Sequence, residues 1–87
     1  PSKEAVGELE RICRQMIPGC WLTLLAYNGS KKPLVLQGQA VDNLALESFV
    51  EQLQKCGNYS RVELLQSQQQ GNVLVYKLQL QMKEGKQ

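Results

Sequence analysis

The strongest constraint on the fold is a run near the C-terminus in which every second residue is large and apolar. In residues 72–83, NVLVYKLQLQMK, the alternating apolar positions are Leu74, Tyr76, Leu78, Leu80 and Met82. Successive side chains of a strand point to opposite faces, so the run predicts a strand with one buried face and one largely wet face. Such a strand needs neighbouring strands and a layer that covers its apolar face.

Three further strands are predicted. Residues 21–40 contain two apolar, strand-favouring runs separated by Asn28-Gly29, a pair typical of hairpin turns. Residues 60–66, SRVELLQ, form another such run. The glutamine-rich stretch that follows, residues 66–70, is interpreted as a polar loop, with Gly71-Asn72 as the turn into the last strand.

Two segments show helical periodicity. In the first, the apolar positions at spacings of three and four are Val6, Leu9, Cys13 and Met16, and the helix is expected to end before Pro18. The second is expected to begin at a cap formed by Asp42 or Asn43 and to stop at Gly57. Its apolar stripe comprises Leu46, Phe49, Val50, Leu53 and Cys56.

The predicted order is therefore helix, strand, strand, helix, strand, strand. We expect an α+β fold: a ferredoxin-like sandwich, circularly permuted (αββαββ), with a four-stranded antiparallel sheet of order 1-2-4-3 and two helices on one face. A chain of 87 residues is enough for one core, so residues 1–87 are expected to form a single domain.

Composition argues against most catalytic and polyanion-binding functions. The formal charge is +2, from ten basic and eight acidic residues, without the basic patch that binds nucleic acid. The chain has no histidine, the commonest general base and metal ligand near neutral pH. We predict no enzymatic activity, no catalytic or metal-binding residues and no cofactor.

The cysteines also fit a structural role. Cys13, Cys20 and Cys56 are odd in number and lack the C-x-x-C spacing of zinc or redox sites. Because Cys13 and Cys56 follow the apolar stripes of the helices, we expect mostly free, buried thiols. A single disulfide or one reactive thiol is the alternative.

Gly38 lies between a predicted strand and a predicted helix, in PLVLQGQAVDN (residues 33–43), and could serve either a ligand or the fold. It shares the core-facing period with Leu34, Leu36 and Ala40, so we expect a packing position where a helix approaches closely or the strand bulges. The segment lacks the second glycine and the lysine of phosphate-binding loops. The alternative is a small ligand-binding regulatory domain that uses Gly38 and Asp42.

The first strand carries the candidate partner-binding residues. We expect it at a sheet edge, with its two faces alternating from residue 21 onward. The face away from the core is predicted to hold Trp21, Thr23, Leu25 and Tyr27, opposite Leu22, Leu24 and Ala26. Exposed aromatic residues favour binding of a protein partner. Alternatively, Trp21 covers the end of the core beside Pro18.

Three stretches resemble the periplasmic domain of PilN-type fimbrial assembly proteins: IPGCWLTLL, LVLQGQAVDNLALESFVEQLQKCGNYSRVELL and VYKLQLQ. The shared pattern is a proline before an aromatic-Leu-Thr strand, an L-x-G-x-A strand before a helix, and an aromatic residue after it that leads to V-x-L. The resemblance spans residues 17–82. The matching positions are Pro18, Trp21, Leu22, Thr23, Leu36, Gly38, Ala40, Phe49, Leu53, Tyr59, Val62 and Leu64. GspL-type components of type II secretion are similar in architecture.

This resemblance implies a structural role in the inner-membrane alignment complex of type IV pili. The parent protein would have a short cytoplasmic segment, one membrane helix and a coiled coil before Pro1, with the present domain in the periplasm. Implied partners are a PilO-like protein of similar fold, a second copy of the chain, and a PilM-like protein that binds the cytoplasmic segment. No reaction or cofactor is implied.

Overall fold

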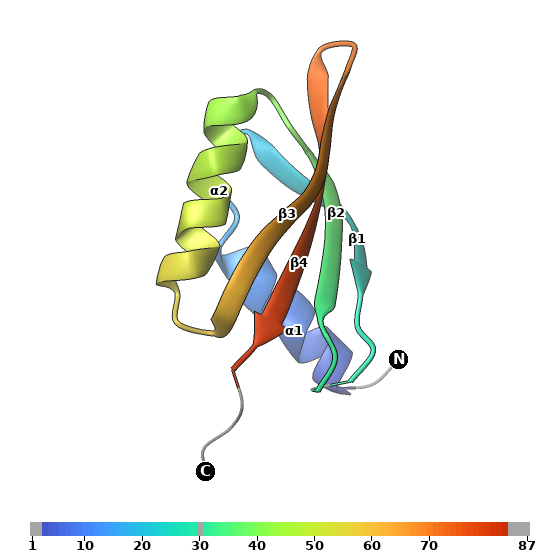
Figure 1. Cartoon of the computed structure of the whole chain (residues 1–87), viewed down its shortest axis with the longest axis vertical. Coiled ribbons are helices and arrows are strands. Elements are labelled where there is room, and N and C mark those ends of the chain that lie inside the picture. The colour runs from blue at the N-terminus through green and yellow to red at the C-terminus, as the bar shows by residue number, and fades with distance from the viewer. Residues whose placement is uncertain (1–2, 30, 84–87) are drawn as a thin grey trace.

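The computed structural model describes residues 3–29 and 31–83. The elements follow the predicted order and are α1 (Lys3–Arg14), β1 (Cys20–Ala26), β2 (Leu34–Ala40), α2 (Asn43–Lys55), β3 (Tyr59–Gln70) and β4 (Val73–Met82). The strands form one antiparallel sheet of order β1-β2-β4-β3. Both helices cover the same face of it (Figure 1). The predicted permuted ferredoxin-like fold is confirmed.

The core lies between the sheet and the helices. β4 is a central strand, and its alternating positions from Leu74 to Met82 are all buried, as its sequence predicts. α1 contributes Ile12 and α2 contributes Phe49, both fully buried. The Phe49 ring packs at a tilt on Tyr76, with 6.0 Å between centroids. Burial of these apolar side chains is the main term that stabilises the domain.

The boundaries of α2 follow from its capping residues. The Asp42 side chain accepts a hydrogen bond from the Ala45 backbone N–H at 2.8 Å, which satisfies a donor that the first turn leaves unpaired. Gly57, with φ 86°, follows the helix in the left-handed conformation that ends many helices. The buried positions of the helix are Leu46, Phe49 and Leu53. The predicted cap, stripe and stop are confirmed.

The predicted buried stripe of α1 is wrong for three of its four residues; the fourth, Met16, lies beyond the end of the helix, is partly buried and packs against the core. Val6, Leu9 and Cys13 are exposed, and the buried residues are Glu8 and Ile12. A glutamate can occupy the buried face because the Arg11 guanidinium donates to its Oε2 at 2.7 Å, which offsets part of the cost of removing the carboxylate from water. The helix therefore turns the face with Glu8 and Ile12 toward the core, and its most apolar stripe faces away from the core.

The glutamine-rich stretch is part of β3 and not a loop. Residues 66–70 pair with β4 up to Gln70 opposite Val73, and only Gly71 and Asn72 form the turn. Gly71 alone has positive φ there, the pattern of a type II′ hairpin turn. Pairing with β4 satisfies those backbone N–H and C=O groups of these residues that point toward β4, and this outweighs the weak strand preference of glutamine.

Gly38 is a packing position, as predicted, but the neighbour that comes close is not a helix. Gly38 pairs with Leu22 on one side and with Tyr76 on the other. A Cβ atom at Gly38 would collide with the Trp21 carbonyl oxygen and with the phenol of Tyr76. The Tyr76 hydroxyl donates a hydrogen bond to that same carbonyl at 3.1 Å. The missing side chain lets Tyr76 reach across β2 to β1.

Replacing Gly38 with alanine should therefore destabilise the domain by about 1–3 kcal/mol, because the added methyl group must displace Tyr76 or β1. Gly7 is the matched control: it lies within α1, and a Cβ atom there would meet no other atom within 4 Å. Gly7→Ala should instead stabilise the domain by about 0.5–1 kcal/mol. Urea denaturation of both variants measures the difference, and a Gly38→Ala variant as stable as wild type would contradict the packing role.

Candidate functional site

β1 is an edge strand of the sheet, as predicted. Within the described residues it pairs only with β2, so one side of its backbone faces no other strand (Figure 1). An uncovered edge presents backbone N–H and C=O groups on which a strand of another chain can form. The side chains that flank this edge are the first candidates for a binding surface.

A bulge divides β1. Leu22 lies opposite Gly38, whereas Leu24 lies opposite Gln37, so two steps along β1 correspond to one step along β2. The extra residue is Thr23, and it reverses which positions face the core. Cys20 is buried before the bulge.

The predicted faces of β1 are therefore wrong beyond Thr23. Leu25 and Tyr27 are partly buried and pack against the core, so they do not share a face with Trp21. Leu24 takes the outward position and is 48% exposed, next to the exposed Thr23. A single bulged residue shifts the period of two by one, and no glycine marks this bulge in the sequence.

Trp21 is held on the open face of the sheet. Its indole Nε1 donates to Gln39 Oε1 at 2.9 Å, and its backbone carbonyl accepts the hydrogen bond from Tyr76. The side chain remains 41% exposed and does not belong to the core cluster. The alternative that Trp21 covers the end of the core does not fit this position. Trp21 and Leu24 together form an apolar surface beside the free edge, which we call the β1 surface.

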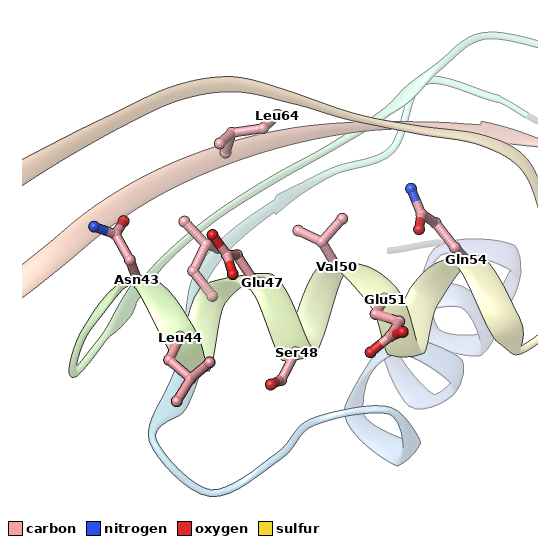
Figure 2. Close-up of a pocket in the computed structure, with 9 residues that line it drawn as sticks. Asn43, Leu44, Glu47, Ser48, Val50, Glu51, Gln54 and Leu64 are labelled. Atoms are coloured by element: carbon pink, nitrogen blue, oxygen red, sulfur yellow. The ribbon is translucent and has the colours of Figure 1, made fainter.

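A shallow groove of about 520 Å³ separates α2 from β3 (Figure 2). Leu64 points from β3 toward the helix, while Glu47 and Val50 point from α2 toward the strand. Leu64 is 45% exposed because α2 does not fully cover β3, the other edge of the sheet. The groove could not be predicted from the apolar residues of β3, because it depends on how much of the sheet α2 covers.

The two residues proposed for a small-molecule site both have structural roles. Gly38 is enclosed between the Trp21 carbonyl and the Tyr76 ring, and the Asp42 carboxylate caps α2. Neither is available to a ligand in this arrangement. This geometry does not favour the regulatory-domain hypothesis.

The three thiols are free, and they differ in exposure. Cys20 is buried and donates to the Ala45 carbonyl at 3.3 Å. Burial, with a smaller effect of the Asp42 charge, raises the pKa of the Cys20 thiol and makes it less reactive. Cys56 is partly buried and donates to the Leu53 carbonyl at 3.1 Å. Cys13 is exposed, contrary to the expected burial.

Two buried polar side chains lie where α1 meets the start of β3, and the structure gives neither the Tyr59 hydroxyl nor Glu8 Oε1 a hydrogen-bond partner. Glu8 and Tyr59 are both buried, and burial, followed by the charge of the Glu8 carboxylate, raises the pKa of the Tyr59 phenol. The phenol is therefore protonated at neutral pH and cannot act as a base there. No group of three or more metal-ligating side chains occurs among residues 3–29 and 31–83.

A sequence model of fimbrial assembly proteins (PilN) matches residues 8–83. The chain belongs to the PilN family. The match begins within α1 and runs to the end of β4, so it includes the β1 surface and the groove. The resemblance carried by the sequence motifs is thus confirmed. No curated protein matches the chain in sequence.

Two solved structures share the fold of this PilN family member. The periplasmic domain of XcpY is 18% identical with a TM-score of 0.70, and the match covers 90% of this chain and 96% of that one. The periplasmic domain of EpsL from Vibrio parahaemolyticus is also 18% identical with a TM-score of 0.70, covering 92% of each chain. Both are of the GspL type, whose architectural similarity was expected. No helix in the described part of the chain is long and apolar enough to cross a membrane.

The bulge in β1 predicts that the same substitution changes stability by very different amounts at two adjacent positions. Leu25→Glu should destabilise the domain by about 2–4 kcal/mol, because it places a charge against the core. Leu24→Glu should change stability by no more than about 0.5 kcal/mol, because the side chain faces water. Thermal unfolding followed by circular dichroism compares the two, and a larger loss for Leu24→Glu would mean that β1 has no bulge at Thr23.

Proposed function

We propose that this domain is a non-enzymatic structural component of the inner-membrane alignment complex of type IV pili and acts by pairing with other protein domains. Membership of the PilN family is the observation that carries this proposal. In it, the domain lies in the periplasm, and a preceding membrane helix anchors it to the inner membrane. The likeness to periplasmic domains of XcpY and EpsL supports the periplasmic location.

The β1 surface is the proposed contact with a PilO-like partner of similar fold. It combines an uncovered strand edge with Trp21, whose hydrogen bond to Gln39 holds the indole in place before any partner arrives. A side chain that is already ordered loses less conformational entropy on binding. Thr23 and Leu24 extend the surface, while Leu25 and Tyr27 support it from the core side.

The chemistry of the domain supports assembly rather than catalysis. The buried thiol and the buried phenols of Tyr59 and Tyr76 all have a raised pKa, so none is activated as a nucleophile or base. The two exposed carboxylates of α2 include Glu51, which forms an exposed ion pair with Lys55 at 3.4 Å.

In the proposed complex, a PilM-like protein binds a segment that precedes this domain.

The test is binding to the purified periplasmic domain of a PilO-like protein, measured by isothermal titration. Leu24→Glu should raise the dissociation constant about tenfold or more, because it places a charge in an apolar contact. The matched control is Leu65→Glu: Leu65 is 46% exposed, like Leu24, but lies on the opposite edge strand. If both variants bind as wild type does, the PilO-like partner does not use the β1 surface.

A further inference from the structure

α1 has two faces that carry apolar side chains, and only one of them is docked on the rest of the domain. The docked face holds Ile12, which is fully buried in the core, and the buried Glu8. The other face holds Val6, Leu9 and Cys13, which are exposed although they recur at spacings of three and four residues. An apolar stripe at this spacing is normally the side that a helix buries.

The docked face leaves a polar atom unsatisfied. Glu8 is only 8% exposed, and its Oε1 atom has no hydrogen-bond partner in the structure. The Arg11 guanidinium donates to the other carboxylate oxygen, Oε2. A buried acceptor without a partner loses its bonds to water and gains none in return. Burial of Ile12 therefore favours this orientation of the helix, whereas the Glu8 carboxylate opposes it.

The two faces are one residue step apart around the helix. Each residue turns an α-helix by about 100° and advances it by about 1.5 Å. A rotation and shift of this size place Leu9 where Glu8 lies and Cys13 where Ile12 lies. The carboxylate of Glu8 then reaches water, and the apolar stripe meets the core. Ile12 leaves the core in exchange, so each orientation buries one set of apolar side chains and exposes the other.

The connection between α1 and the sheet is compatible with such a movement. α1 ends at Arg14 and β1 begins at Cys20, so residues 15–19 separate the two elements. Gly19 in this connection adopts a left-handed conformation, with φ 94°. The Gln52 amide donates to Gln15 Oε1 at 2.8 Å, but this bond is exposed and water competes for both groups.

We propose that α1 is a two-state element that docks either through Glu8 and Ile12, as in this structure, or through the stripe of Val6, Leu9 and Cys13. The rotation removes the stripe from the surface and brings Glu8 and Ile12 out in its place. A partner that contacts the stripe binds only the first orientation and therefore stabilises it. The inference does not involve the β1 surface, so it holds whether or not that surface binds a PilO-like protein.

Alkylation of Cys13 tests the rotation, because its thiol is exposed in one orientation and buried in the other. Ile12→Glu disfavours the docked face by placing a charge in the core, and Glu8→Lys does so by adding a positive charge beside Arg11. Both should turn the stripe inward and slow the reaction of Cys13 with iodoacetamide about tenfold or more. Mass spectrometry assigns each labelled site, and protection of the buried Cys20 shows that the domain is folded.

Leu9→Glu is the matched control. Alone, it should leave the labelling rate of Cys13 unchanged, because Leu9 is exposed in the docked orientation. Combined with Ile12→Glu or Glu8→Lys, it places a charge on each face, and Cys13 should react as fast as in the wild type.

A helix with a single docking face gives a different result. Ile12→Glu and Glu8→Lys would then release α1 or unfold the domain, and Cys13 would react at least as fast as in the wild type. Slower labelling in either variant that Leu9→Glu reverses supports the inference. Labelling of Cys13 at the wild-type rate or faster in both variants overturns it, whether the domain is folded or not. Slower labelling that Leu9→Glu fails to reverse overturns it as well.

Discussion

The contact of Tyr76 with Gly38 and the Trp21 carbonyl organises the sheet on its β1 side. Tyr76 belongs to β4, crosses the position where Gly38 has no side chain, and donates a hydrogen bond to β1 at 3.1 Å. One side chain thereby joins three strands, over a separation of 55 residues between donor and acceptor. Because the Trp21 backbone is fixed from the core side, its indole is directed outward to Gln39. The β1 surface is therefore ordered by the same contact that requires a glycine in β2.

Bulges give both edges of the sheet a defined shape. The bulge at Thr23 places Leu24 outward and Leu25 inward on β1, and two register shifts on β3 divide its pairing with β4 into a regular stretch from Arg61 to Leu64 and another from Gln66 to Gln70. Bulges and charged residues are common means of preventing unspecific edge pairing. A domain that assembles with selected partners needs this restriction as much as it needs an accessible edge. In this chain the β1 edge, which its bulge shapes, is also the surface to which we assign a PilO-like partner.

Where local sequence and tertiary packing agree, the sequence predicted the structure correctly. The alternation of β4, the stripe and caps of α2, and the core position of Gly38 all follow from period and turn chemistry. The errors have tertiary causes. A bulge without glycine reversed the faces of β1, the Arg11 ion pair allowed Glu8 to be buried in α1, and pairing with β4 made the glutamine stretch a strand. Of the four predicted binding residues, Trp21 and Thr23 are exposed, while Leu25 and Tyr27 pack against the core.

Amide hydrogen exchange of a Tyr76→Phe variant tests most directly whether the Tyr76 hydrogen bond holds β1 in place. This substitution keeps the ring over Gly38 and removes only the donor to the Trp21 carbonyl, at a cost of about 0.5–1.5 kcal/mol. We predict that amides of β1 lose protection to a greater extent than amides of the β3–β4 hairpin, because the lost bond ties β1 to β4. Equal loss of protection in both regions, or unchanged exchange in β1, would contradict the account.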